Sequence, residues 1–136
     1  MKKVTMIYII LLFSSCVIMK QELPQITTKL LPSVCSNLHS FLSENWYKHR
    51  TKKCHKNTFD VYKFSIDYRE CILLLTKKQI IMLFGEPDKI TNYGEFQYIL
   101  DTDCSDNSLR NYHYINFEFK QDSVIDVEGG EISIIE

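Results

Sequence analysis

The chain begins with two lysines and a short apolar stretch, and this leader decides which residues are left to build a fold. Lys2 and Lys3 precede residues 4–13, which carry no charge. Ten residues span about 15 Å as a helix, half of a hydrocarbon core of roughly 30 Å. Positive charges before so short an apolar run are typical of a secretory signal peptide. We therefore expect residues 1–15 to be removed and the remainder to fold outside the cytosol.

The apolar run ends in Ser14-Ser15-Cys16. This order resembles a lipobox, in which lipid is joined to the thiol before cleavage, although Phe13 stands where leucine is usual. An ordinary secretory signal and an uncleaved buried helix are the alternatives, and neither explains the thiol. Two or three acyl chains, palmitate among them, hold a protein stably on a bilayer. We predict that Cys16 becomes the lipid-bearing N-terminus and that no other cofactor is present.

The residue after the cysteine bears on location. Val17 is not the aspartate that, by resemblance to lipoprotein sorting rules, retains lipoproteins at the inner membrane. The cell envelope, with the outer membrane favoured, is therefore the expected location, and the face of the membrane is left open.

Composition favours one domain with little affinity for nucleic acid. We expect a tether over 16–32 and a single domain over 33–136. Without Lys2 and Lys3, the sixteen basic residues fall to fourteen against seventeen acids, a net charge of −3. The basic run 48–56 is the exception. It is interpreted as a solvated helix end, with contact to anionic headgroups or an acidic partner as the alternative.

Four further cysteines predict two disulfides, because an even number in an exported chain favours oxidised pairs. They are Cys35, Cys54, Cys71 and Cys104. Three connectivities are possible and the sequence does not choose among them. We prefer Cys71 with Cys104 and Cys35 with Cys54.

Two groups of residues in the sequence could bind a metal ion. Cys35, His39, Cys54 and His55 are potential zinc ligands, but their spacing matches no finger or ribbon. Asp101, Asp103 and Asp106 lack the glycine and glutamate of a calcium loop, so a solvated loop is preferred. We expect no metal.

Hydrophobic spacing predicts the remaining elements. We expect a first helix over 34–49, where an apolar stripe is formed by Val34, Leu38, Phe41, Leu42 and Trp46. The pattern of 57–70 is ambiguous, because residues 64, 66 and 68 alternate like a strand while residues 61, 64 and 68 fit a helix, and we prefer an irregular link leading into a turn at 71–75. A helix at 77–84 is followed by strands at 96–100, 112–120 and 123–127, the last two joined by a two-residue turn at 121–122. Gly129-Gly130 is expected to end the last strand, leaving 132–135 as an edge strand or an apolar tail.

The helix at 77–84 has the clearest local signals. Thr76 and Gln79 have the spacing of a capping box, in which each side chain satisfies the other residue's backbone amide. Gly85 suits the left-handed residue that ends a helix, and Pro87 forbids its continuation.

This helix and the strands after it resemble the SmpA/OmlA (BamE-like) outer-membrane lipoproteins. The resemblance covers residues 70–128. It rests on the capped helix with Gly85-x-Pro87, on Phe96-x-Tyr98, on Phe117-x-Phe119 and on Val124-Ile125-Asp126. It implies an α+β fold, with two helices on one face of a three- or four-stranded antiparallel sheet, and a scaffold role in outer-membrane protein assembly.

No Gly-x-Ser-x-Gly, Walker, GxGxxG or HExxH pattern occurs, and we expect no enzyme. His113 is interpreted as a core or edge histidine. The leading hypothesis is an anchored module that contacts an envelope protein through a sheet face or an exposed aromatic such as Tyr93, Tyr98, Tyr112 or Tyr114. The alternative is a periplasmic or surface inhibitor or ligand-binding protein.

Overall fold

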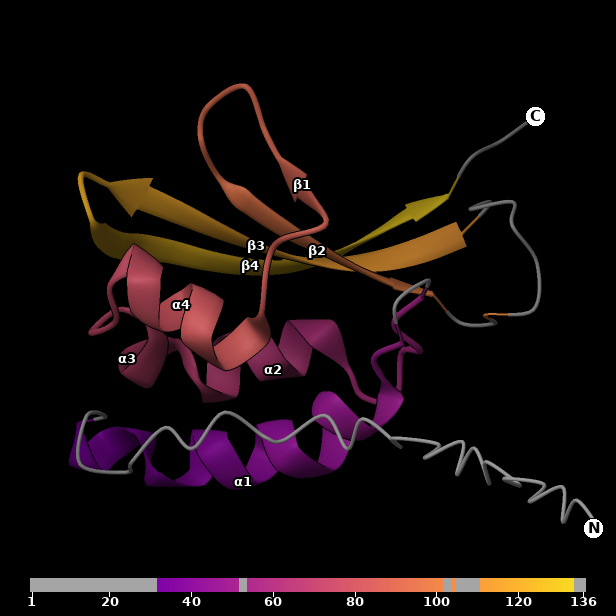
Figure 1. The fold of residues 1–136 in the computed structure, drawn as a ribbon, viewed down its shortest axis with the longest axis horizontal. Helices are drawn as coiled ribbons and strands as arrows, with labels where there is room; N and C mark the ends of the chain where they lie inside the picture. Colours follow the sequence, from indigo (N-terminus) through magenta and orange to yellow (C-terminus); the bar gives the residue numbers. More distant parts are fainter. Residues whose placement is uncertain (1–31, 52–53, 102–103, 105–110, 134–136) are drawn as a thin grey trace, which may run out of the picture.

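The computed structural model describes residues 32–51, 54–101, 104 and 111–133. It confirms an α+β fold in which helices cover one face of an antiparallel sheet (Figure 1). The sheet has the order β1-β2-β3-β4, with strands β1 (Lys89–Ile90), β2 (Phe96–Asp101), β3 (Asn111–Lys120) and β4 (Ser123–Ser133). In Figure 1 helices α2, α3 and α4 lie beneath the sheet, and α1 crosses below them.

The predicted first helix is a helical region in three pieces. They are η2 (Ser33–Cys35), α1 (Ser36–Asn45) and η3 (Tyr47–His49). Leu38, Leu42 and Trp46 of the predicted apolar stripe are fully buried. Val34, which the stripe also included, is about half exposed, at 51%. The stripe therefore identified the helix but overestimated its buried length.

The prediction of an irregular link over 57–70 is wrong. The segment contains α2 (Val61–Asp67) and leads into α3 (Arg69–Ile72). Asp60 caps α2 by accepting a hydrogen bond from the Lys63 amide at 3.0 Å, as short polar side chains do at helix N-termini. The alternation that suggested a strand includes Ile66, which is 73% exposed, so it was not a core pattern.

Helix α4 (Lys77–Phe84) has the predicted bounds and the predicted caps. The Gln79 amide donates to Thr76 Oγ1 at 3.3 Å, and the Thr76 amide donates to Gln79 Oε1 at 2.8 Å. Gly85 has φ of 82°, a region that favours glycine. The Lys77 amide also donates to the carbonyl of Asp122, in the predicted two-residue turn between β3 and β4. This contact attaches the start of α4 to that hairpin.

The end of α4 is held by side chains from two distant segments. A helix leaves its last carbonyls without intrahelical donors, and here four successive carbonyls accept from side chains. Tyr47 Oη donates to Leu83, Trp46 Nε1 and Arg50 to Phe84, Tyr98 Oη to Gly85, and Arg50 again to Glu86. The segment after α1 and strand β2 thus meet at this helix end.

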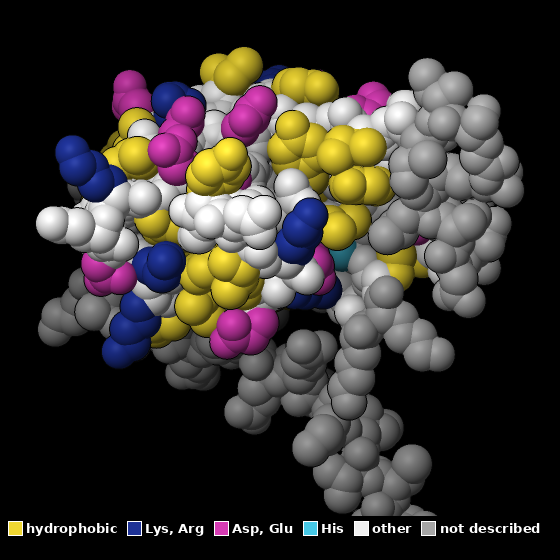
Figure 2. All heavy atoms as spheres, turned by 90° about the horizontal axis from the view of Figure 1, so that it is seen from above, with side chains coloured by type: hydrophobic (Ala, Val, Ile, Leu, Met, Phe, Trp, Pro, Cys, Tyr) yellow, Lys and Arg dark blue, Asp and Glu magenta, His cyan; other side chains and the backbone are white. Residues whose placement is uncertain are grey.

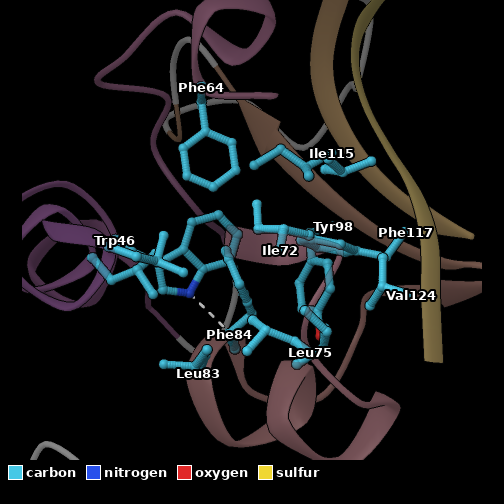
Figure 3. Close-up of a cluster of buried hydrophobic side chains, with 14 of the residues drawn as sticks. Trp46, Phe64, Ile72, Leu75, Leu83, Phe84, Tyr98, Ile115, Phe117 and Val124 are labelled. Carbon is cyan, nitrogen blue, oxygen red and sulfur yellow. Dashed lines mark hydrogen bonds between the residues drawn. The ribbon is translucent and has the colours of Figure 1, made fainter. Parts of the chain in front are cut away.

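The core between helices and sheet is built around aromatic rings (Figure 3). The ring of Trp46 lies 5.1 Å from that of Phe84 and 5.6 Å from that of Tyr98, both edge-on. Phe84 in turn lies 5.0 Å from Phe117 of β3. Such offset and edge contacts stabilise aromatic pairs beyond the burial of their area.

Strand β4 does not end at Gly129-Gly130, contrary to prediction. Ile132 and Ser133, expected in a separate edge strand or tail, belong to β4, residues 134–135 lie outside the described residues, and β1 is a strand that was not predicted. β4 pairs with β3 through both glycines as far as Ser133. The glycines are there because neighbours approach closely. A Cβ on Gly129 would lie 2.2 Å from the carbonyl oxygen of Val61, and one on Gly130 would lie 2.3 Å from the ring of Tyr114.

All four cysteines form disulfides, but our preferred pairing is wrong. Cys35 is bonded to Cys71 and Cys54 to Cys104. The first pair forms because α3 packs against the start of the α1 region. The second forms because the chain at Lys56 bridges to Asp101 at the end of β2. The sequence could not choose between these pairings, because both depend on tertiary packing.

The basic run 48–56 is only partly solvated. Lys48 and Lys56 are exposed, as predicted. Arg50 binds the end of α4, and its guanidinium lies 5.5 Å from the centre of the Trp46 ring. His55 is 4% exposed, contacts Trp46 edge-on at 3.8 Å between ring centres, and leaves both ring nitrogens without a hydrogen-bond partner. Burial, then the charges of Arg50 and His49, lower the pKa of His55 to about 3.

Tyr98→Phe is expected to destabilise the fold by about 1–3 kcal/mol, because it leaves the carbonyl of Gly85 without its donor in a buried place. The measurement is the free energy of unfolding from urea titration. Tyr93→Phe removes the same hydroxyl from a side chain that is 90% exposed, and is expected to change stability by less than about 0.5 kcal/mol. Equal effects would show that the bond to Gly85 contributes nothing.

His55→Phe is expected to remove a stability loss that begins in mild acid. The unfolded chain binds a proton near the ordinary pKa of 6.5, whereas the folded chain binds one only near 3. Stability therefore falls by about 1.4 kcal/mol for each pH unit below 6.5. Unfolding free energies between pH 7 and 5 measure this slope. His39→Gln is the control and should keep it, while an unchanged slope in His55→Phe would contradict the assignment.

Candidate interaction surface

The face of the sheet turned away from the helices is a candidate binding surface, and we call it the open face. Cross-strand partners share a face of a sheet, so the register assigns its residues. Three rows across β2, β3 and β4 lie on it: Gln97–Asn116–Glu128, Ile99–Tyr114–Gly130 and Asp101–Tyr112–Ile132. The alternate rows, which include Phe96–Phe117–Val127, are buried under the helices.

Three tyrosines cluster at the β4 side of the open face. Tyr114 lies across Gly130, where only a hydrogen stands beneath its ring. Burial raises the pKa of Tyr114, and the neighbouring groups Glu128, Tyr62 and Tyr112 raise it further. Tyr62 belongs to α2 and is 53% exposed, so it extends this cluster past the β4 edge. The tyrosine cluster (Tyr62, Tyr112 and Tyr114) thus consists of two side chains of β3 and one of α2.

A polar group occupies the other end of the same face. Asn116 Nδ2 donates to Glu95 Oε2 at 3.0 Å, and Thr91 Oγ1 donates to the same oxygen at 3.0 Å. Asn116 Oδ1 is buried and has no hydrogen-bond partner. A buried acceptor without a donor is unfavourable, and a donor brought by a ligand would satisfy it.

The charges on the open face are mostly acidic. Glu118, Glu128 and Asp126 stand on β3 and β4, and Lys89 lies in register with Gln97. Asp126 is neutralised by Arg69 at 2.7 Å, and Arg69 also donates to the carbonyl of Val127. Seen from the sheet side, hydrophobic side chains form separate groups among charged ones (Figure 2). Such a mixed surface is typical of recognition by a protein or a polar ligand.

The four tyrosines predicted as exposed contacts have different positions. Tyr93 is 90% exposed in the β1–β2 loop, and Tyr112 and Tyr114 are half-buried on the open face. Tyr98 is fully buried, so its prediction as a contact is wrong. Its burial follows from its register on the helix-covered face and its hydroxyl's bond to Gly85 at 2.7 Å.

The other predicted residues lie elsewhere or outside the description. Thr76, Gln79, Gly85 and Phe96 are part of the helix-side structure, with Pro87 just after α4. Cys16 and the leader fall outside the described residues. The suggested zinc ligands Cys35 and Cys54 are in disulfides, and residues 32–51, 54–101, 104 and 111–133 contain no metal-binding group of three. No helix among them is long and apolar enough to cross a membrane.

His113 lies near one end of the interior strand β3, between Leu100 of β2 and Glu131 of β4. Its Nε2 lies 3.8 Å from Glu131 Oε2. Its Nδ1 is buried without a hydrogen-bond partner. The residue is therefore not at a sheet edge, and its ring is only partly satisfied.

Sequence reasoning missed most of the open face. The alternation in β3 identified the face that carries His113, Ile115, Phe117 and Phe119. The same alternation assigns Tyr112 and Tyr114 to the opposite face, so the sequence could have predicted that they lie together. Tyr62 carried no usable signal, because its segment was not recognised as a helix. Gly130 was interpreted as a strand end and not as space for a ring.

No protein-family model, no curated protein and no solved structure matches the chain. The resemblance to the SmpA/OmlA lipoproteins therefore stays a prediction.

Alanine at Gly129 is expected to destabilise the fold more than alanine at Gly130. Gly129→Ala places a methyl against the backbone of Val61, so α2 must shift, at about 1–3 kcal/mol or more. Gly130→Ala meets the far end of the Tyr114 side chain, which can swing away, so the cost should stay below about 1 kcal/mol. Thermal unfolding checks the order, and a larger loss in Gly130→Ala would contradict it.

Proposed function

We propose that the protein is a lipid-anchored, non-catalytic module of the bacterial cell envelope, which contacts a partner protein through its open face. Cys16 carries the lipid, residues 16–32 span the distance to the bilayer, and the α+β domain is the binding part. The observation that carries the proposal is the tyrosine cluster. It presents two half-buried rings, Tyr112 and Tyr114, on a sheet face that no described helix covers, and a more exposed third ring, Tyr62, on α2 beside that face.

The tyrosines have the properties of an interface centre. A tyrosine offers a large apolar area with a polar tip at low entropic cost, and such rings are enriched in binding hot spots. Tyr114 is also positioned in advance, since Gly130 lies under its ring and Glu128 beside it. A side chain that is already ordered loses less freedom on binding.

The charges indicate the chemistry of the partner. With Asp126 paired to Arg69, Glu128 remains beside Tyr114, and Glu118 lies further along the same face. A partner surface that combines apolar groups with lysine or arginine would complement them. The acidic face also disfavours direct contact with anionic headgroups, which fits a domain that turns this face away from the bilayer.

Outer-membrane protein assembly is the process in which we place this module, because the resemblance over 70–128 implies it. The structure supports the domain's general build, helices on one face of an antiparallel sheet. The alternative is an inhibitor or ligand-binding protein. Tyrosine rings beside Glu128 would also suit a polysaccharide, so the alternative predicts binding of an envelope polysaccharide or an exported hydrolase to the same face.

Site-specific photocrosslinking in intact cells tests the contact. A photoreactive phenylalanine analogue at Tyr62 or at Tyr112 is expected to give a defined protein adduct in the membrane fraction. Leu74 is the matched control, since it is 58% exposed against 53% for Tyr62 but lies between α3 and α4 in the helix layer. Charge reversal by Glu128→Lys should weaken the adduct.

The outcomes separate the hypotheses. Adducts of equal strength from Leu74 and Tyr62, or none from either Tyr62 or Tyr112, would contradict the proposed contact. An adduct with a soluble exported hydrolase would favour the inhibitor reading. Cys16→Ser should move the protein from the membrane to the soluble fraction, and its retention there would contradict the lipid anchor.

A further inference from the structure

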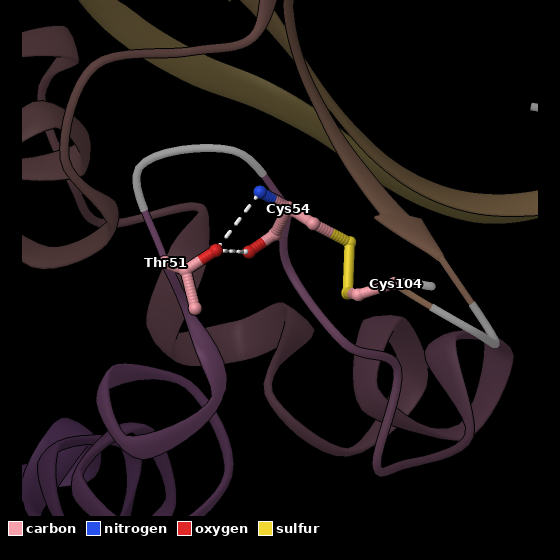
Figure 4. The surroundings of a disulfide bond; sticks show 3 residues. All are labelled: Thr51, Cys54 and Cys104. Atoms are coloured by element: carbon pink, nitrogen blue, oxygen red, sulfur yellow. Dashed lines mark hydrogen bonds between the residues drawn. A yellow bond between two sulfur atoms is a disulfide. The ribbon is translucent and has the colours of Figure 1, made fainter. Parts of the chain in front are cut away.

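The two disulfides differ in their access to solvent. Cys35 is 0% exposed and Cys71 is 4% exposed, and both belong to the hydrophobic core. Cys54 is only partly buried and Cys104 is exposed. Figure 4 shows the bond between them. An attacking thiolate must approach a disulfide along the sulfur–sulfur axis, so access controls the rate of exchange. Only the Cys54–Cys104 bond meets this requirement.

The two residues of the exposed bond also differ in their own access to solvent. Cys104 is exposed, whereas Cys54 is partly buried. Cys104 is therefore the more accessible sulfur to attack, and Cys54 is the one released.

The surrounding structure does not depend on this bond. The Asp101 amide donates to the carbonyl of His55 at 2.8 Å, and the Asn57 amide donates to the carbonyl of Asp101 at 2.6 Å. Thr51 Oγ1 donates to the carbonyl of Cys54 and accepts from its amide, at 2.8 and 3.0 Å (Figure 4). These bonds hold the segment around Cys54 against the end of β2 and in its own turn. None of them uses a cysteine sulfur, so we expect them to persist when the disulfide is opened.

We propose that Cys54–Cys104 is a thiol-exchange site for an exported dithiol, and that Cys35–Cys71 is a permanent cross-link. A thiolate of the dithiol attacks Cys104, forming a mixed disulfide and releasing Cys54 as a thiolate. The second thiol of the reductant then displaces Cys104. Two electrons pass to the protein, which gains two thiols, and the dithiol becomes a disulfide. The reverse sequence reoxidises the pair.

Graded reduction of the full-length protein, purified from membranes in detergent, tests the selectivity. Dithiothreitol is the probe, iodoacetamide traps the thiols, and peptide mass spectrometry locates them, with Cys16 scored separately. Alkylation of Cys54 and Cys104 is expected to be at least about tenfold faster than that of Cys35 and Cys71, with circular dichroism unchanged. Reduction of both bonds at the same rate, or of Cys35–Cys71 first, would overturn the proposal.

Single-cysteine variants test the direction of exchange. Cys104→Ser leaves the Cys54 thiol, and Cys54→Ser leaves the Cys104 thiol, with the core disulfide present in both. The Cys104 thiol is expected to react with iodoacetamide faster than the Cys54 thiol, because Cys104 is the more exposed of the two. In the native protein, brief treatment with glutathione should place the mixed disulfide on Cys104. A mixed disulfide found mainly on Cys54, or the opposite order of reactivity, would overturn the assignment.

Discussion

The carbonyl groups at the end of α4 are the constraint on which the rest of the fold depends. Four of them accept side-chain hydrogen bonds, and the donors come from the segment after α1 and from β2. Two of these donors, Trp46 and Tyr98, also belong to the aromatic centre of the core, where their rings contact Phe84 and each other. A helix of eight residues thereby fixes the distance between the helix layer and the sheet.

The parts of the fold with local signals were predictable. The capping box at Thr76 and the glycine at Gly85 are decided by neighbours in sequence, so α4 was predicted to the residue. The hairpin at 121–122 followed from alternation on both sides. Helix α2 was missed because its apolar residues fit both a strand alternation and a helical spacing, so an irregular link was predicted. The disulfide pairing and the burial of His55 depend on segments distant in sequence, which no local pattern encodes.

The sequence predicted the type of binding surface but not all of its residues. A sheet face with tyrosines was expected, and Tyr112 and Tyr114 are on it, but Tyr98 is in the core because its neighbour Ile99 occupies the open side. The glycine pair in β4 shows how packing on the two faces of the sheet determines which side chains lie on each. Gly129 lets α2 approach the helix side and Gly130 lets Tyr114 lie flat on the other. One dipeptide thus shapes both faces, and the tyrosine cluster is as much a product of packing as the core is.

We propose that this domain works from a bilayer to which its first mature residue is covalently attached. The most direct measurement is the mass of the N-terminal peptide from protein isolated from its own cells. We expect a peptide that begins at Cys16 and carries diacylglycerol, with or without a further acyl chain. A peptide that begins at Met1, with the leader intact and the Cys16 thiol unmodified, would contradict the anchor and the proposed function with it.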